Sequence, residues 1–261
     1  QWALPQLRMR WAGFRKVRGQ VCKRVARRMG ELGLDREADY RAYLESSPQE
    51  WSLLDSLCRV SVSRFYRDRL LFTHLQREVF PELARAALCR GDDRLRVWSL
   101  GCASGEEPYS VALMWTLELQ ASYPGLRLEI LASDADGALL RRARRACYPY
   151  SAVKNLPAAW REAAFTRRGE QYLLEASYRQ PVSFAEQDVR VAITEGPWDL
   201  VLCRNLVFTY FIEPVQCEIL QRLQASIRAG GALVIGIHET LPACAAGLAV
   251  WSEKVGIYKK S

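Results

Sequence analysis

The chain has 261 residues, of which 49% are hydrophobic and eight are tryptophan, so it can bury a sizeable core in one large domain or two small ones. No apolar run approaches the about 20 residues that cross a bilayer, and the first residues lack a signal-peptide pattern, so we expect no membrane insertion. The formal charge is +8, but nine of the 37 basic residues and none of the 29 acidic ones precede Glu31. The excess of positive charge therefore belongs to one N-terminal segment.

Residues 1–75 are predicted to form a helical domain and a linker. Apolar residues recur every three or four positions from Phe14 to Leu32, as on the buried face of a helix. The opposite face carries basic residues: Lys16, Lys23, Arg24, Arg27 and Arg28. Such a face can bind an acidic helical protein, contact nucleic acid phosphates or simply be solvated. The face lacks interleaved aromatic residues, which disfavours nucleic acid.

Residues 76–261 are predicted to form an α/β domain. Four short apolar runs alternate with helical stretches, which indicates a mostly parallel, doubly wound sheet. The predicted strands are Leu95–Leu100, Leu128–Ser133, Trp198–Cys203 and Ala232–Ile237. Residues 249–260 resemble a strand, a turn and a second strand at an antiparallel edge. Residues 160–186 interrupt the alternation with short β-prone pieces, and we expect a small antiparallel subdomain inserted there.

A glycine loop, GCASGEEPYS from Gly101 to Ser110, follows the first predicted strand. Such a loop lets a ligand approach the backbone at a helix N-terminus, but it is not the G-x-G-x-x-G fingerprint of dinucleotide-binding proteins. Glu106 and Glu107 would repel a pyrophosphate, whereas they can accept hydrogen bonds from an amine or a hydroxyl. The other interpretation is ordinary helix capping by Ser104 and the two acids.

The second predicted strand ends at Asp134, where a carboxylate can bind the two hydroxyls of a ribose. Asp134 could instead cap the next helix, a role that Asp136 can fill equally well. Loop and acid together are more specific than either alone. They favour a cationic nucleoside ligand such as S-adenosylmethionine.

The eight cysteines are far apart, contain no CxxC pair and mostly lie in apolar runs. This pattern is typical of buried free thiols in a reduced, cytoplasmic protein, and it predicts no metal site. There are only two histidines, and His74 lies in a stretch with a helical pattern. The scarcity of histidine makes catalysis by histidine a narrow possibility.

Four segments of the sheet domain resemble the chemotaxis receptor methyltransferases, the CheR-type family: WSLGCASGEEPYS, LASDAD, CRNLVFTYF and GGALVIGIHETLP. The N-terminal VARRMGELGLDREADYRAYLES and SVSRFYRD are similar to the helical domain and linker of that family. The resemblance covers nearly the whole chain. It implies a helical domain followed by a Rossmann-like class I methyltransferase domain with an inserted β-subdomain. It also implies S-adenosylmethionine as donor, S-adenosylhomocysteine as product and protein glutamates as acceptors.

The resemblance also implies the site residues. The implied cofactor-binding residues are Ser61, Ser63, Arg67, Gly101, Glu106, Asp134, Asp188, Val189, Arg204 and Asn205. Ser61 and Ser63 stand where the family usually has Asn and Thr. The family usually places a Tyr four residues after the Asn of its RN pair, but Thr209 occupies that position here and Tyr210 follows it. We expect Arg67 and Tyr210 to orient the donor and the acceptor.

The sequence thus predicts an S-adenosylmethionine-dependent methyltransferase acting on a carboxylate, with an acidic helical protein such as a receptor cytoplasmic domain as partner. A glutamate side chain is already ionised at pH 7, because its pKa is about 4.3, so it requires alignment rather than a strong base. The shifted Tyr210 keeps open a small-molecule carboxylate or thiol as acceptor. A basic nucleic-acid-binding module is the alternative from another class of protein.

Overall fold

The computed structural model describes residues 1–261 as two compact units. The N-terminal unit contains Gln1–Val62 and Thr209–Ile212, and the sheet unit contains Ser63–Phe208 and Glu213–Ser261. The sequence placed the boundary at residue 75, whereas residues 63–75 belong to the sheet unit, because Phe65, Phe72 and Leu75 are fully buried in its core. None of the helices is both long and apolar enough to cross a membrane.

The N-terminal unit consists of helices and one returning segment. Its helices are α1 (Ala3–Gln6), a 3-10 turn (Trp11–Phe14), α2 (Arg18–Glu31), α3 (Glu37–Ser46) and α4 (Pro48–Cys58). The segment Thr209–Ile212 bonds to the chain before α2: Arg10 N donates to Tyr210 O at 2.8 Å, and Ile212 N donates to Arg8 O at 3.1 Å. The ring of Tyr210 lies 5.1 Å from that of Phe14. This unit is therefore built from two distant parts of the sequence.

Two of the basic residues on α2 hold this unit together. Arg28 donates from Nε and Nη2 to the two carboxylate oxygens of Glu50, each at 2.9 Å, and the Tyr40 hydroxyl donates to Glu50 at 3.0 Å. Arg24 donates to the carbonyl oxygens of Leu57 and Arg59 at the end of α4. Arg24 and Arg28 are half-buried, whereas Lys23 and Arg27 are exposed. The basic face of α2 is thus partly internal structure.

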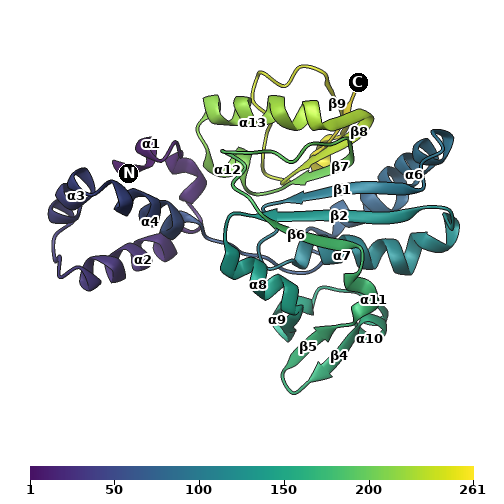
Figure 1. Cartoon of the computed structure of the whole chain (residues 1–261), viewed down its shortest axis with the longest axis horizontal. Coiled ribbons are helices and arrows are strands. Elements are labelled where there is room, and N and C mark those ends of the chain that lie inside the picture. Colours follow the sequence, from purple (N-terminus) through teal and green to yellow (C-terminus); the bar gives the residue numbers. More distant parts are fainter. The chain divides into compact units, whose positions relative to one another are not determined.

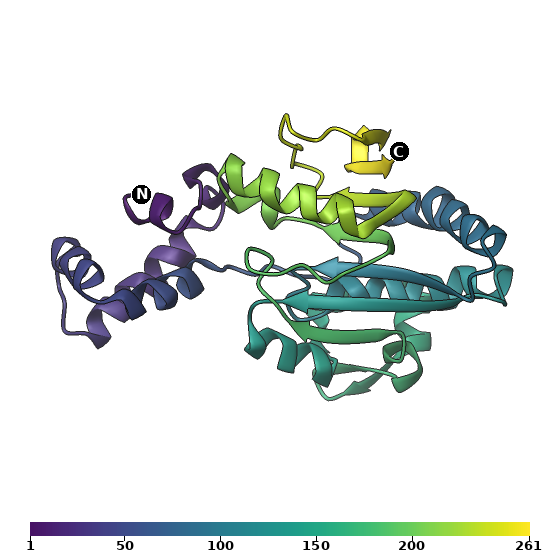
Figure 2. The same ribbon diagram turned by 45° about the horizontal axis from the view of Figure 1, so that its top comes forward.

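The sheet unit is an α/β fold, as the sequence predicted, and its main sheet has the order β6-β2-β1-β7-β8-β10-β9 (Figures 1 and 2). These strands are β1 (Arg94–Leu100), β2 (Arg127–Asp134), β6 (Val182–Glu186), β7 (Trp198–Cys203), β8 (Ile227–Ile235), β9 (Leu248–Ser252) and β10 (Ile257–Lys260). The first five are parallel, and β10 and β9 add an antiparallel edge. All four predicted strands of the parallel sheet are present. Their carboxyl ends meet at one edge of the sheet.

Helices cover both faces of this sheet. The helices after residue 63 are α5 (Arg69–His74), α6 (Phe80–Cys89), α7 (Glu106–Met114), α8 (Gly137–Arg145), α9 (Tyr150–Val153), α10 (Ala158–Ala164), α11 (Ala176–Arg179), α12 (Val207–Tyr210) and α13 (Glu213–Ser226). Of these, α9 and α10 contact a second, smaller sheet, and the last two residues of α12 belong to the N-terminal unit. The connections β1–α7–β2 and β2–α8…β6 step in one direction, and β7–α13–β8 steps in the other. Because such crossovers are right-handed, α7 and α8 lie on the face opposite α13. In Figure 1, α7 and α8 lie beside β2 and β6, and α13 lies beside β8.

A second sheet is small and antiparallel, with the order β3-β5-β4. It consists of β3 (Cys147–Pro149), β4 (Phe165–Arg168) and β5 (Gln171–Leu174). It differs from the predicted insertion at both ends. Residues 147–149 join it, whereas β6, assigned to the insertion from the sequence, pairs in parallel with β2 along Ile130–Asp134. Partly buried, alternating β6 is typical of an edge strand, and sequence periodicity does not reveal which sheet it extends.

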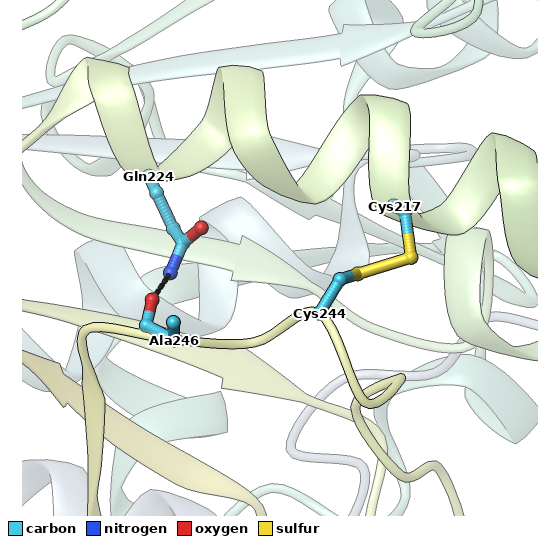
Figure 3. Close-up of a disulfide and its surroundings, with 4 residues drawn as sticks. All are labelled: Cys217, Gln224, Cys244 and Ala246. Atoms are coloured by element: carbon cyan, nitrogen blue, oxygen red, sulfur yellow. Dashed lines mark hydrogen bonds between the residues drawn. A yellow bond between two sulfur atoms is a disulfide. The ribbon is translucent and has the colours of Figure 1, made fainter.

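The expectation that every cysteine is free is wrong. Cys217 on α13 and Cys244 in the loop after β8 form a disulfide, with Cα atoms 6.1 Å apart (Figure 3). Gln224 Nε2 donates to Ala246 O at 2.6 Å about two turns further along α13. Because the two cysteines are 27 residues apart, no local spacing indicates their pairing. The other six are free: Cys22, Cys58, Cys89, Cys102, Cys147 and Cys203.

Replacing Glu50 by Gln should destabilise the N-terminal unit by about 2 kcal/mol, since Arg28 loses its buried charge partner. Arg28 and Tyr40 hold the pKa of Glu50 below its ordinary value. Its stabilisation is therefore present above the unfolded-state pKa of about 4.3 and disappears as pH falls through the lower folded-state value. Calorimetric unfolding of wild type and E50Q across this range measures both effects.

The matched control is Glu45→Gln. Glu45 pairs with Arg41 at 3.1 Å, but both side chains are 55% exposed, so this pair contributes little to stability. Equal losses of stability in E50Q and E45Q, or an E50Q loss that persists at the acid limit, contradict a stabilising role for the buried pair.

Candidate active site

The glycine loop links β1 to α7 in a conformation that glycine favours. Gly101 and Gly105 have φ of +72° and +90°, in the left-handed region. A Cβ on Gly101 would lie 2.8 Å from Leu206, and one on Gly105 would lie 3.0 Å from Ala143. The tight loop brings its backbone to the carboxyl edge of the sheet and directs the N-terminus of α7 toward the same edge.

Glu106, the first residue of α7, lines a cleft of about 380 Å³ in the sheet unit. Its side chain is 2% exposed, and the Ser104 hydroxyl lies 3.0 Å from both carboxylate oxygens. The Tyr148 hydroxyl in turn donates to Ser104 O at 2.7 Å. Ser63 of the linker lines the same cleft, so two of the predicted cofactor-binding residues lie together there.

Glu107 performs a different task from Glu106. One oxygen accepts from the Ser99 hydroxyl at 2.8 Å, and the other accepts from Arg204 Nη1 at 2.8 Å. The other terminal nitrogen of the Arg204 guanidinium, Nη2, donates to the Asp68 carboxylate. The guanidinium, whose side chain is 3% exposed, thus joins the end of β7 to the linker and to α7. Its Nε is buried without a partner, so one donor of the site has unused capacity.

Asp134 ends β2 and does not cap α8. Its oxygens accept from Ala103 N at 2.8 Å and from Asp136 N at 3.0 Å. Asp136 caps α8 by accepting from Ala138 N and Leu139 N. Of the two interpretations of Asp134, capping is therefore excluded. Its carboxylate holds the glycine loop against the tip of β2.

Asn205 follows Arg204 with φ of +56°, and its backbone N donates to Glu239 at 2.9 Å. The same Glu239 oxygen accepts from Gly236 N at 2.6 Å, and a Cβ on Gly236 would lie 2.5 Å from the Asn205 amide nitrogen. Buried Glu239 therefore clamps the loops after β7 and β8 together, with Gly236 leaving room for Asn205.

The remaining predicted residues lie in separate settings. Asp188 binds Arg190 through both oxygens, with a shortest distance of 2.6 Å, and Val189 next to it is buried. Arg67 is half-buried, and its carbonyl oxygen lies 3.5 Å from Arg204 Nη2. Ser61 and Tyr210 belong to the N-terminal unit.

The residues of the sheet unit fit S-adenosylmethionine. A buried carboxylate at Glu106 suits a cationic amino group, and the acid at the tip of β2 suits ribose hydroxyls. Gly101 and Gly105 let the loop pack closely against Leu206 and Ala143, which keeps its backbone at the same edge of the sheet as the two acids. Burial, Asp134 and Glu107 raise the pKa of the Cys102 thiol well above its ordinary value, so this neighbouring cysteine is not a nucleophile at neutral pH.

The sequence did not indicate that Asp68 and Glu239 belong to this arrangement. It also did not separate the role of Glu107 from that of Glu106. Asp68 adopts φ of +64°, which is unusual for a non-glycine residue, but φ cannot be read from a sequence. Glu239 lies in the HETLP segment, whose likeness to the family was the one available signal.

The parallel sheet, its glycine loop and the acid at the tip of β2 define an S-adenosylmethionine-dependent methyltransferase. The family described as "CheR methyltransferase, SAM binding domain" matches residues 61–255. This chain belongs to the CheR methyltransferase family. The family resemblance inferred from the sequence and the predicted cofactor are confirmed.

Named relatives agree with the family. A chemotaxis protein methyltransferase of Listeria monocytogenes is 36% identical over 186 residues, which cover 71% of this chain and 68% of the relative. Chemotaxis protein methyltransferase 2 of Pseudomonas aeruginosa is 32% identical over 230 residues, which cover 84% and 77%. A probable biofilm formation methyltransferase, WspC, of the same organism is 32% identical over 218 residues, covering 82% and 50%.

If Asp134 binds the ribose, replacing it by Ala should weaken binding of S-adenosylhomocysteine roughly tenfold to a hundredfold, because charge-assisted hydrogen bonds to the ribose would be lost and the glycine loop would lose its bond from Ala103 N. Isothermal titration calorimetry measures this affinity. The control is Asp136→Ala, which removes only the cap of α8. Unchanged affinity in D134A, or equal losses in both variants, would remove Asp134 from the binding site.

Proposed function

We propose that this chain methylates glutamate side chains of an acidic, helical protein acceptor such as the cytoplasmic domain of a chemoreceptor. The observation that carries this proposal is a cleft lined by the buried carboxylate of Glu106 and by no histidine. His74 lies on α5 with its ring bonded to Leu70 O, and His238 is exposed next to Glu239 and does not line the cleft. Relatives that are named chemotaxis protein methyltransferases support a chemoreceptor as the acceptor.

An acceptor carboxylate requires no proton transfer, since it is already ionised near neutral pH. When bound, S-adenosylmethionine supplies a methyl group on a cationic sulfur. The acceptor oxygen forms a bond to the methyl carbon while the carbon–sulfur bond breaks, and its electron pair stays on sulfur. A neutral methyl ester and a neutral thioether result. The protein therefore has to align the two reactants and exclude water.

We assign the cofactor shell to the residues inferred from the family. Glu106 would accept from the amino group of the donor, Asp134 from its ribose, and the Asp188–Val189 segment would lie at the adenine. Arg67 and Tyr210 would orient the donor and the acceptor. The contacts of Arg204 with Glu107 and Asp68 support a positioning role for this arginine, and Glu239 would position Asn205.

A receptor cytoplasmic domain as acceptor would place this enzyme in the cytoplasm. Reducing conditions there disfavour disulfides in most organisms. We therefore expect the Cys217–Cys244 pair to be dispensable for methyl transfer.

The proposed reaction predicts that label from methyl-labelled S-adenosylmethionine, supplied with cell extract and membranes, appears on a membrane protein. A glutamyl methyl ester releases methanol in mild base, so the label should be volatile after alkali treatment. Label in a small-molecule fraction, or label on protein that survives alkali, contradicts a protein glutamate acceptor. Heat-denatured enzyme is the control.

The exposed part of the α2 face predicts a second result. Lys23→Gln with Arg27→Gln should raise the KM for the acceptor severalfold, because two exposed cations are lost, while affinity for S-adenosylhomocysteine stays unchanged. Arg24→Gln with Arg28→Gln removes the same charge but also breaks contacts inside the unit, so it should lower thermal stability. An unchanged KM in the first variant assigns that face to solvent.

A further inference from the structure

A second concentration of positive charge lies in the sheet unit, where the whole-chain sum hides it. From Gly137 to Arg161 there are six basic residues and no acidic one. Four of them, Arg141, Arg142, Arg144 and Arg145, lie on α8, and all four are exposed. Acidic residues elsewhere in the sheet unit offset this positive charge. The net charge outside the N-terminal segment is therefore close to zero, although this part of the surface is basic.

Part of this charge gathers around the cleft that Glu106 lines. Arg64 of the linker, Arg142 of α8 and Lys154, the residue after α9, all line that cleft. All three are exposed, and none of their side chains forms a salt bridge or a hydrogen bond. We call Arg64, Arg142 and Lys154 the cationic rim. Two hydroxyl residues of the cleft, Ser63 and Ser151, add neutral hydrogen-bonding groups.

The cleft thus combines two opposite kinds of charge in different surroundings. Its one carboxylate, Glu106, is 2% exposed and is held by Ser104, whereas its three cations are exposed and unpaired. A buried carboxylate suits the cationic amino group of the donor. Three exposed cations from three separate elements exceed what the single carboxylate of the donor can neutralise, and they match a ligand that carries several carboxylates.

We propose that the cationic rim binds acidic side chains of the methyl acceptor that flank the glutamate to be methylated. This inference rests on the proposed function, since it assigns a surface to the acidic helical acceptor named there. The rim would hold neighbouring carboxylates of the acceptor beside the cleft where Glu106 holds the donor. It acts on acceptor binding and takes no part in methyl transfer.

The experiment compares two double variants that lose the same charge. Arg142→Gln with Lys154→Gln removes two cations of the rim, and Arg141→Gln with Arg168→Gln removes two exposed cations that do not line the cleft. The probes are a synthetic helical peptide with glutamates along one face and the same peptide with glutamines. Binding of each is measured by calorimetry with the full chain saturated with S-adenosylhomocysteine, whose own Kd is measured separately.

We expect the wild type to prefer the glutamate peptide and the rim variant to bind it about threefold to tenfold more weakly, a size typical of two exposed charge contacts. The control variant and the Kd of S-adenosylhomocysteine should stay within twofold of wild type. Circular dichroism of each variant verifies its fold.

Several results would contradict the proposed role of the cationic rim in acceptor binding. Equal affinities of the two double variants show only a loss of net charge, and equal binding of both peptides by the wild type, or binding of neither, shows no carboxylate recognition. Weaker S-adenosylhomocysteine binding in the rim variant alone assigns these cations to the donor. The labelling experiment is independent of this one. If the rim recognises the glutamate peptide but methyl label appears only on small molecules, carboxylate binding by the rim is supported and the proposed protein acceptor is contradicted.

Discussion

The buried guanidinium of Arg204 is the constraint on which the active-site edge of the sheet depends. A charge with 3% side-chain exposure is tolerated only when partners neutralise it, and its partners come from two other parts of the fold. Asp68 connects Arg204 to the linker, and Glu107 connects it to the N-terminus of α7. The end of β7, the linker and the helix after the glycine loop therefore keep their relative positions, because separating them would leave a buried charge without a counter-ion.

This constraint explains why two adjacent glutamates differ in chemistry. Successive residues at a helix start point about 100° apart, so Glu107 turns toward β1 and Arg204 while Glu106 turns toward the cleft. The carboxylate of Glu107 is used in hydrogen bonds that hold the fold, whereas the carboxylate of Glu106 faces the cleft and is available for a ligand. Asp134 and Asp136 divide their tasks in the same way: Asp136 caps α8, and Asp134 holds the loop.

Much of the fold follows from local patterns in the sequence. Fully buried parallel strands such as Leu200–Cys203 of β7 are apolar runs, and the glycine loop and Asp134 are adjacent to such runs. The features that were missed depend on long-range contacts. Neither the pairing of β6 with β2 nor that of Cys217 with Cys244 leaves a periodic trace. The distinction between Arg28, which binds Glu50, and exposed Arg27 is likewise decided by residues over 20 positions away.

The return of Thr209–Ile212 to the N-terminal unit has a consequence for how the chain folds during synthesis. A ribosome makes Gln1–Val62 before the sheet unit, but the N-terminal unit also contains four residues that emerge about 150 positions later. A Cβ on Gly13 would lie 2.2 Å from Thr209 O, so these residues pack tightly against the chain before α2. The helices can form early, yet the surface around Met9 and Phe14 stays uncovered until most of the sheet unit has been made. Completion of the N-terminal unit thus depends on synthesis of the sheet unit that follows it in the chain.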